Sequence, residues 1–328
     1  MRRNGAIFAA LVAVCIAGSA VAIAAGMSSE EPRIATSESS RQVLTAAQAD
    51  RRPVVVFRSL EPEGQVAVSA LGTPAKPTFQ PLSCDRVHFA AGRGLCLARS
   101  GGLGTGLSAK LFDADLRVRH ELDLEGVPSR ARVSPDGRYG TVTTFVSGHS
   151  YASAGSFSTA TTLIDMARGE TIATLEDFTV TRAGRQVTAV DSNYWGVTFA
   201  RDSDQFYATL ATGGKTYLIE GSVSRRVGRV IHENVECPSL SPDGTRIAYK
   251  RRTGSKPTTP WRLAVLDLST MRETMLGELR SIDDQAEWLD DDQVLYGLED
   301  QVWAVPADGK GKPQRFLAAA GSPAVVRW

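Results

Sequence analysis

The sequence has almost no net charge and very little histidine. Its 37 lysine and arginine residues balance 36 aspartate and glutamate residues, which leaves a formal charge of +1. A chain so close to neutrality has no field of one sign to attract nucleic acid or an anionic membrane. The four histidines lie too far apart in the sequence to predict a metal site: His88, His120, His149 and His232. We therefore expect neither nucleic-acid binding nor a bound metal.

Motifs of catalysis and cofactor binding are also missing. The glycine-rich segment 101–106 lacks the strand and helix setting of a dinucleotide loop, and segment 309–312 lacks the Ser or Thr of a P-loop. No Gly-x-Ser-x-Gly elbow is present. The acidic clusters at 202–204 and 290–292 have the wrong spacing for a calcium loop and fit solvated turns. The sequence thus predicts no catalytic site and no cofactor.

Only one long apolar run occurs, and it lies at the N-terminus. It covers residues 6–26 and follows Arg2 and Arg3, which is the positive-then-hydrophobic order of an export signal. A cleaved signal peptide over 1–26 and a retained transmembrane anchor that tethers the chain both fit this run. Either one places the rest of the chain outside, secreted or anchored to the outer face of the cytoplasmic membrane, because the positive end stays in the cytoplasm.

The remainder divides into a polar segment and a long β-rich region. Residues 27–52 are rich in Ser, Glu, Thr, Ala and Gln and predict a disordered tether. Over residues 53–328, short apolar runs alternate with Gly, Pro, Asp and Asn, and helical periodicity is absent. This region is therefore expected to form one all-β domain.

A repeated segment predicts the architecture. Leu240–Tyr249 contains Ser-Pro-Asp-Gly followed by a β-rich run, and Val133–Tyr139 repeats this order. Looser copies occur at 199–207, 288–296 and 89–95. In such a turn Pro sets φ, Asp bonds to nearby backbone and Gly adopts the left-handed conformation, so each copy reverses one strand into the next. A period of about 40 residues is typical of β-propellers.

Whole units of four antiparallel strands are expected at 86–125, 130–176, 195–231, 236–278 and 285–317. Val54–Leu60 and Gln65–Leu71 resemble the outer two strands of a further blade, and Pro323–Trp328 resembles an inner strand. Paired together, these segments form a sixth blade from both chain ends and close the ring without exposed edges. The sequence thus predicts a monomeric six-bladed β-propeller of four-stranded antiparallel blades, closed by pairing of its N- and C-terminal segments.

Three cysteines follow the N-terminal apolar run: Cys84, Cys96 and Cys237. In an oxidising compartment, one disulfide and one leftover thiol are the simplest expectation. Cys84 and Cys96 are nearest in sequence, but they flank a turn near Gly92 whose register places Cys96 opposite His88. A bridge between them requires the chain before the first blade to fold back. A Cys84–Cys96 disulfide and buried free thiols therefore remain alternatives.

The segment 241–249 resembles the WD-like propeller repeat of the TolB family, in which Ser-Pro-Asp-Gly precedes polar residues, an aliphatic residue, Ala and an aromatic residue. The copy that begins at Ser134 departs from this pattern after Gly137. The resemblance covers residues 53–328 and implies a propeller fold more strongly than a function. Together with the N-terminal apolar run and the cysteines, the chain looks like an exported TolB-like translocation protein. The segment before residue 53 is too short for the additional N-terminal domain of TolB.

Long connections predict where a partner binds. Ser147–Thr159, Glu176–Tyr194 and Arg251–Trp261 belong to connections that open on the face opposite the Ser-Pro-Asp-Gly turns, whereas the equivalent at Gly213–Gly214 is tight. Aromatic and arginine side chains on such loops have the composition of a protein recognition surface, although surface loops also tolerate insertions without any function. The candidate binding residues are His149, Tyr151, Phe157, Asn193, Tyr194, Arg251 and Arg252.

These patterns favour an exported, non-catalytic platform that binds an envelope or secreted protein. Two other functions remain open. A hydrolase or lyase of the propeller type needs ionisable groups that converge around the central channel, and the sequence predicts few of them there. A glycan or a small ligand could alternatively bind in the channel.

Overall fold

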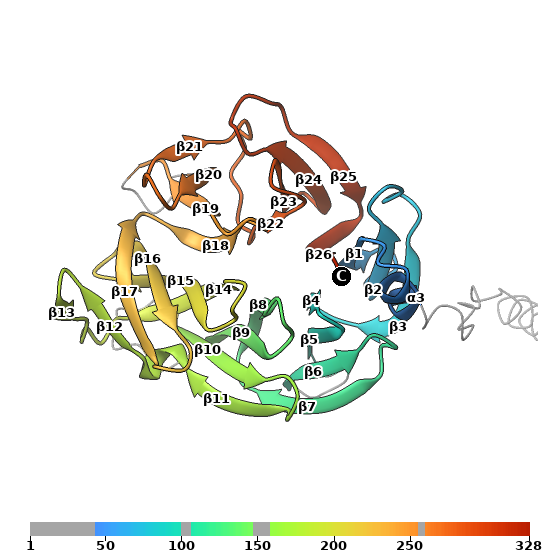
Figure 1. Ribbon diagram of the computed structural model, residues 1–328, viewed down its shortest axis with the longest axis horizontal. Coiled ribbons are helices and arrows are strands. Elements are labelled where there is room, and N and C mark those ends of the chain that lie inside the picture. The colour runs from blue at the N-terminus through green and yellow to red at the C-terminus, as the bar shows by residue number, and fades with distance from the viewer. Residues whose placement is uncertain (1–42, 100–105, 147–157, 255–259) are drawn as a thin grey trace, which may run out of the picture. The chain divides into compact units, whose positions relative to one another are not determined.

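The protein is a six-bladed β-propeller in which six antiparallel sheets are arranged radially around a central axis (Figure 1). The computed structural model describes residues 43–99, 106–146, 158–254 and 260–328. Each blade has four strands, and one blade carries two additional strands at its outer edge. The predicted fold class and the predicted number of blades are confirmed.

The strands of the blades are as follows, each blade from its inner to its outer strand. The first blade has β4 (Arg86–Ala90), β5 (Arg93–Arg99), β6 (Leu107–Asp113) and β7 (Val118–Leu124). The second has β8 (Val127–Val133), β9 (Tyr139–Val146), β10 (Ser158–Asp165) and β11 (Glu170–Thr174). The third has β14 (Asn193–Phe199), β15 (Gln205–Thr212), β16 (Lys215–Ser222) and β17 (Val227–Glu233).

The remaining blades follow the same order. The fourth has β18 (Glu236–Leu240), β19 (Arg246–Arg252), β20 (Trp261–Asp267) and β21 (Glu273–Met275). The fifth has β22 (Glu287–Trp288), β23 (Gln293–Leu298), β24 (Gln301–Pro306) and β25 (Gln314–Ala318). The sixth has β26 (Ala320–Val326), β1 (Val54–Leu60), β2 (Glu63–Ala70) and β3 (Thr78–Ser83).

The two chain ends pair to complete the sixth blade, as predicted. Strand β1 runs antiparallel to β26, with Val54 opposite Val326 and Ser59 opposite Ala320. The position of β1 and β2 within the blade differs from the prediction, because they are its second and third strands and β3 is the outermost. Beyond the pairing, the indole Nε1 of Trp328 donates a 2.9 Å hydrogen bond to the Arg52 carbonyl.

The Ser-Pro-Asp-Gly segments form the tight reversals expected between the first and second strands of a blade. In the second blade, Gly137 N–H donates to the Ser134 carbonyl at 2.8 Å, and the Ser134 hydroxyl donates to Asp136 at 2.7 Å. Gly137 has a φ of 71°, which is in the left-handed region. The turns between the first and second strands therefore share one face of the ring, which we call the turn face; we call the opposite face the loop face.

A short helix, α3 (Val43–Ala49), precedes the first strand. Leu44 and Ala47 are buried and pack in the cluster that contains Val66 and Phe89, between the sixth and first blades. The prediction of a disordered tether over 27–52 is therefore wrong for its last ten residues, because this apolar contact orders them. Residues 1–42, with the predicted signal or anchor, lie outside the described part of the chain. No helix among the described residues has the length and apolar character needed to cross a membrane.

The predicted loop Glu176–Tyr194 also differs from the expectation. After the 3-10 helix η1 (Leu175–Asp177), it forms β12 (Thr179–Arg182) and β13 (Arg185–Gln186). Strand β12 pairs in parallel with β17 and covers the outer edge of the third blade. Val180 is only 1% exposed in the core between the second and third blades, so burial and edge pairing hold this segment down.

A disulfide joins Cys84 to Cys96, while Cys237 is a buried free thiol. Cys84 directly follows β3 of the sixth blade, and its N–H donates to the Gly64 carbonyl at 2.8 Å. Cys96 lies in β5 of the first blade opposite Val87, one residue away from the predicted register. The chain before the first blade thus folds back as the bridge requires, and the bond links two neighbouring blades covalently.

Removal of this disulfide is expected to destabilise the closed ring. A bridge across about a dozen residues restricts the unfolded chain and contributes on the order of 3 kcal/mol to the free energy of unfolding. We expect the double variant C84S/C96S to lose about this amount in equilibrium urea unfolding. An unfolding free energy equal to that of the unmodified protein would contradict the prediction.

Candidate functional site

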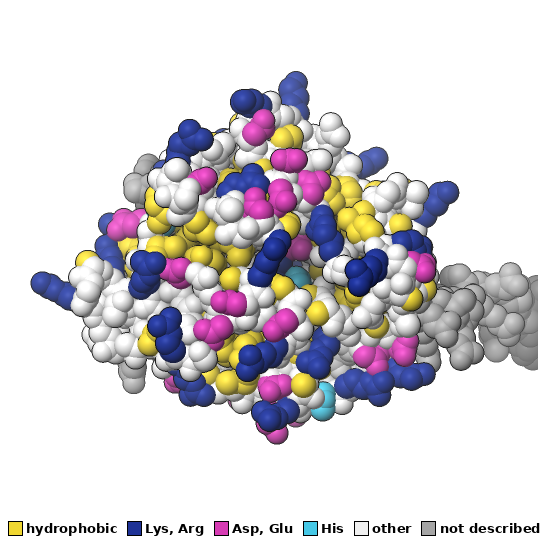
Figure 2. All heavy atoms as spheres, viewed as in Figure 1, with side chains coloured by type: hydrophobic (Ala, Val, Ile, Leu, Met, Phe, Trp, Pro, Cys, Tyr) yellow, Lys and Arg dark blue, Asp and Glu magenta, His cyan; other side chains and the backbone are white. Residues whose placement is uncertain are grey.

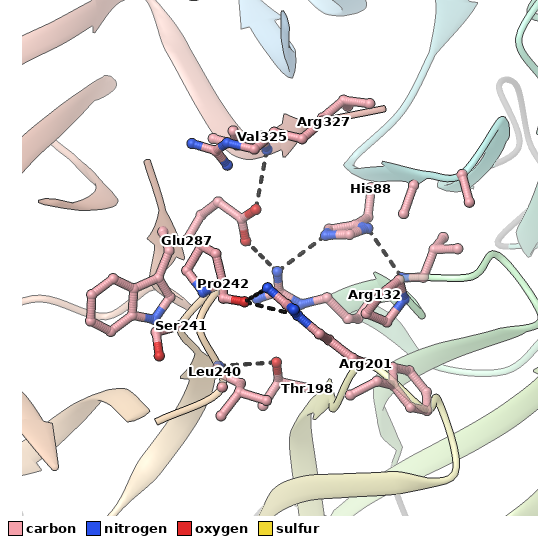
Figure 3. A pocket seen from close by; sticks show the side chains of 18 residues that line it. His88, Arg132, Thr198, Arg201, Leu240, Ser241, Pro242, Glu287, Val325 and Arg327 are labelled. Atoms are coloured by element: carbon pink, nitrogen blue, oxygen red, sulfur yellow. Dashed lines mark hydrogen bonds and ion pairs between the residues drawn. The ribbon is translucent and has the colours of Figure 1, made fainter. Parts of the chain in front are cut away.

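A cavity of about 250 Å³ opens at the centre of the turn face, where the inner strands end. Its charged lining comes from five different blades and consists of His88, Arg132, Arg201, Glu287 and Arg327 (Figure 3). Trp288, Phe199, Pro135 and Pro242 supply apolar walls. On the face that Figure 2 shows, basic and acidic side chains surround the centre of the ring, and a histidine side chain is visible within it.

Arg132 connects the residues at the floor of this cavity through an ion pair and hydrogen bonds. The residue is 9% exposed, and Nη1 donates to the carboxylate of Glu287, which is equally buried. Nη2 donates to the Ala286 carbonyl at 3.2 Å and to the Ser239 hydroxyl at 3.4 Å. The second carboxylate oxygen of Glu287 accepts the N–H of Val325 at 3.1 Å. The second, fourth, fifth and sixth blades are therefore joined across the channel by one buried ion pair and its hydrogen bonds.

His88 lies beside this ion pair as a neutral ring. Burial, and then the charge of Arg132, hold the pKa of His88 well below its usual value. The N–H of Val133 donates to Nδ1 at 3.1 Å, so the single ring proton is on Nε2. Nε2 lies 3.1 Å from Nη1 of Arg132, which is itself a donor. Two N–H groups therefore converge on the floor of the cavity without an acceptor between them.

The rim of the cavity carries two further arginines. Arg201 donates through Nε and Nη2 to the Pro242 carbonyl, at 3.3 and 2.9 Å, and Arg327 donates to the Leu289 carbonyl. Neither forms an ion pair with any carboxylate in the described part of the chain. The lining thus has three guanidinium groups and the single carboxylate of Glu287, which leaves two positive charges in excess.

Charged residues also converge near the loop face of the channel. Lys250 is 3% exposed, and its Nζ lies 2.5 Å from Asp283 and 3.7 Å from Glu236. Burial raises the pKa of Glu236 to about 7, although Lys250 and Arg252 act in the opposite direction. The expectation that few ionisable groups surround the channel is therefore wrong. Charges are tolerated there because each of these groups is paired.

Comparisons with known proteins agree with this architecture. No family model matches the sequence, and no curated protein matches it. Among solved structures, TolB from Acinetobacter baumannii aligns with a TM-score of 0.55 and 15% identity over 84% of this chain. The fold is similar to TolB. The match covers 66% of the TolB chain, so this protein spans just under two thirds of TolB. A chain from the structure of a nidogen/laminin complex aligns with a TM-score of 0.55 and 11% identity, over 83% of this chain and 98% of the other.

The structure places the predicted binding residues in different environments. His149, Tyr151 and Phe157 lie outside the described residues. Tyr194 is 4% exposed in the core, and its carbonyl accepts the Thr161 hydroxyl at 2.6 Å, so its prediction as a surface residue is wrong. Its side chain is apolar enough to be drawn into the contact between two blades.

The other three candidates lie at the loop face and take part in local contacts. The Asn193 side chain accepts the Thr159 N–H at 2.9 Å. Arg251 lies 3.0 Å from Glu273, and the guanidinium of Arg252 stacks 4.1 Å from the ring centre of Trp261. Asn193 thus supports the base of the connection between the second and third blades, and Arg251 and Arg252 present a partly covered basic edge.

The turn-face cavity, which we also call the channel mouth, was not predicted because its lining residues are far apart in the sequence. One signal was available in the inner strands, where polar residues alternate as Arg130 and Arg132 in β8 and as Gln285 and Glu287 around the start of β22. Alternate residues of a strand face the same side, so this pattern directs two polar side chains per strand toward the axis.

Removal of Arg132 is expected to leave Glu287 buried without its partner. Loss of one member of a buried ion pair costs about 3–5 kcal/mol, whereas replacement of both by apolar groups is far less costly. We expect R132M to lose about this amount in urea unfolding, and the double variant R132M/E287L to recover most of it. Equal losses for the single and double variants would show that the pair is not energetically coupled.

The buried His88 predicts a dependence of stability on pH. Since its folded pKa is below its unfolded value of about 6.5, the unfolded state binds more protons between these two values. Stability from this group is complete above about pH 6.5 and is lost as the pH falls below it. We expect H88N to flatten the change in unfolding free energy between pH 8 and pH 5, and a slope equal to that of the unmodified protein would contradict the prediction.

Proposed function

We propose that this protein is an exported, non-catalytic β-propeller that binds a protein of the cell envelope or a secreted protein through its loop face. The binding surface includes the second-to-third strand connections of the second and fourth blades. The ring serves as a rigid support that holds these connections in fixed positions.

Export is supported by two independent features. The basic and apolar N-terminus has the order of an export signal. The Cys84–Cys96 disulfide is the kind of bond that persists in oxidising compartments and is rare in the cytosol. The similarity to TolB is consistent with a place in the cell envelope.

The observation that carries the proposed binding surface is a set of exposed apolar residues. Val127, Phe145 and Val190 are 58%, 39% and 79% exposed, and all three lie at the loop-face ends of their strands or connections. Val127 is directly opposite Phe145 in the sheet. Val127 and Phe145 thus form an exposed apolar pair, and exposed apolar groups of this kind are typical of protein interaction sites.

Protein binding by a propeller of this shape has a structural parallel. The similar nidogen/laminin structure is that of a complex between two proteins. By analogy of fold, the same architecture can present a docking surface here, and the residues that form it are those of the loop face.

The loop that carries His149, Tyr151 and Phe157 can be removed without disturbing the sheet. Val146 and Ser158 are cross-strand partners, so replacement of residues 147–157 by Asn-Gly closes β9 and β10 with a two-residue hairpin. We expect this variant to be exported but to lose its crosslinked protein partners, measured by crosslinking in intact cells and mass spectrometry.

A matched control shortens a connection of the same class in the first blade. Arg99 and Leu107 are cross-strand partners, so residues 100–106 can be replaced by Asn-Gly in the same way. The control should retain the wild-type partners. Partners that survive in the 147–157 variant, or that are lost equally in the control, would contradict the proposed surface.

A further inference from the structure

The cavity of the turn face is lined by more hydrogen-bond donors and more positive charge than the described residues around it neutralise. It lies opposite the proposed docking surface, at the other end of the channel, so it is a separate site. Its features are the pair of convergent donors on the floor, the two rim arginines and the small volume.

The floor contains donors in excess of acceptors. Nη1 of Arg132 uses one N–H for Glu287 and has a second one on the same nitrogen. The Nε2–H of His88 faces this nitrogen at 3.1 Å, and a neutral ring that already accepts from Val133 has no acceptor left. An oxygen that accepts from both groups would relieve this contact, and a carboxylate oxygen has the lone pairs and the charge to do so.

The rim contributes the second half of the site. Arg201 and Arg327 approach the cavity with only main-chain carbonyls as partners among the described residues. A carbonyl oxygen accepts a hydrogen bond but carries no full negative charge. It therefore does not neutralise the guanidinium as a carboxylate does. Both oxygens of Glu287 are taken by Arg132 and the Val325 N–H, so this residue cannot neutralise the rim as well. The excess of two positive charges in the lining matches a ligand with two negative charges.

The size of the cavity selects a small molecule. A volume of about 250 Å³ is below the range of drug-sized pockets, roughly 300–1,000 Å³, and suits a ligand with a short carbon chain. The walls formed by Trp288, Phe199 and the two prolines offer apolar surface for methylene groups between two charged ends. The indole of Trp288 is fixed by a 2.8 Å hydrogen bond to the Ser239 carbonyl, so this wall is preformed.

We propose that the channel mouth is a binding site for a small aliphatic dicarboxylate. One carboxylate accepts hydrogen bonds from His88 and Arg132 on the floor. The other pairs with Arg201 and Arg327 at the rim. The ligand is bound and not transformed in this site.

Titration calorimetry of the purified full chain tests this site, with succinate and glutarate as probes at constant ionic strength. Butyrate has one carboxylate and no group for the rim, so it should bind about tenfold more weakly or worse, which is the worth of one charge-assisted hydrogen bond. Putrescine, which has positive ends on a similar chain, should not bind. Absence of binding by both dicarboxylates at millimolar concentration would overturn the proposal.

Rim variants separate recognition from folding. We expect R201Q and R327Q each to weaken succinate binding about tenfold and to leave butyrate binding nearly unchanged. R93Q is the matched control, because Arg93 also donates to a carbonyl of a neighbouring turn, that of Gly137 at 3.0 Å, but does not line the cavity. An equal loss in R93Q would indicate a general charge effect and overturn the proposal.

The side chains of an acidic peptide also offer carboxylate groups, and a further titration distinguishes such a peptide from a small dicarboxylate. An acetylated, amidated Glu-Glu-Glu-Glu peptide should bind more weakly than succinate if the cavity is closed around a small molecule. Binding of the peptide without binding of succinate would overturn the dicarboxylate assignment and assign the mouth to an acidic protein segment. The measurements need no protein partner, so failure of the proposed loop-face function leaves their outcome unaffected.

Discussion

The pairing of β1 with β26 is the constraint on which the rest of the structure depends. It joins segments from the two ends of the propeller in one sheet and so completes the sixth blade. Without it the ring would have two unprotected edges, and the inner strands would not converge on one axis. The channel mouth, which takes residues from several blades, exists only in the closed ring.

The blades were predictable from the sequence, but helix α3 and strand β12, which pack against them, were not. Ser-Pro-Asp-Gly specifies a turn through local backbone chemistry, so its repetition reports the start of each blade wherever it occurs. Helix α3 has seven residues, too few to be stable alone, and owes its order to the burial of Leu44. Strand β12 is likewise ordered by the neighbour whose edge it covers. Tertiary contacts of this kind leave no periodic signal in the sequence.

The two candidate surfaces also differ in whether the sequence could predict them. The loop face could be expected because long connections are visible as insertions between repeats. The turn-face cavity could not, since Arg132 and Glu287 are 155 residues apart and meet only through the symmetry of the ring. The ring thereby separates the loop face, where we propose that a protein binds, from the basic cavity of the turn face, with the paired charges of Lys250, Glu236 and Asp283 near the loop-face end of the channel.

The separation of β1 and β26 along the chain has a consequence for biosynthesis. A ribosome makes β1 before the other strands of the propeller and β26 after them, so the sixth blade stays incomplete until β26 has been made. The disulfide and α3 can hold β1–β3 against the first blade in the meantime, because all of their residues precede position 125. Until then β1 has an unpaired edge, and an unpaired strand edge is a template for pairing with another chain. The strand order thus makes closure of the ring, and protection of this edge, depend on the synthesis of β26.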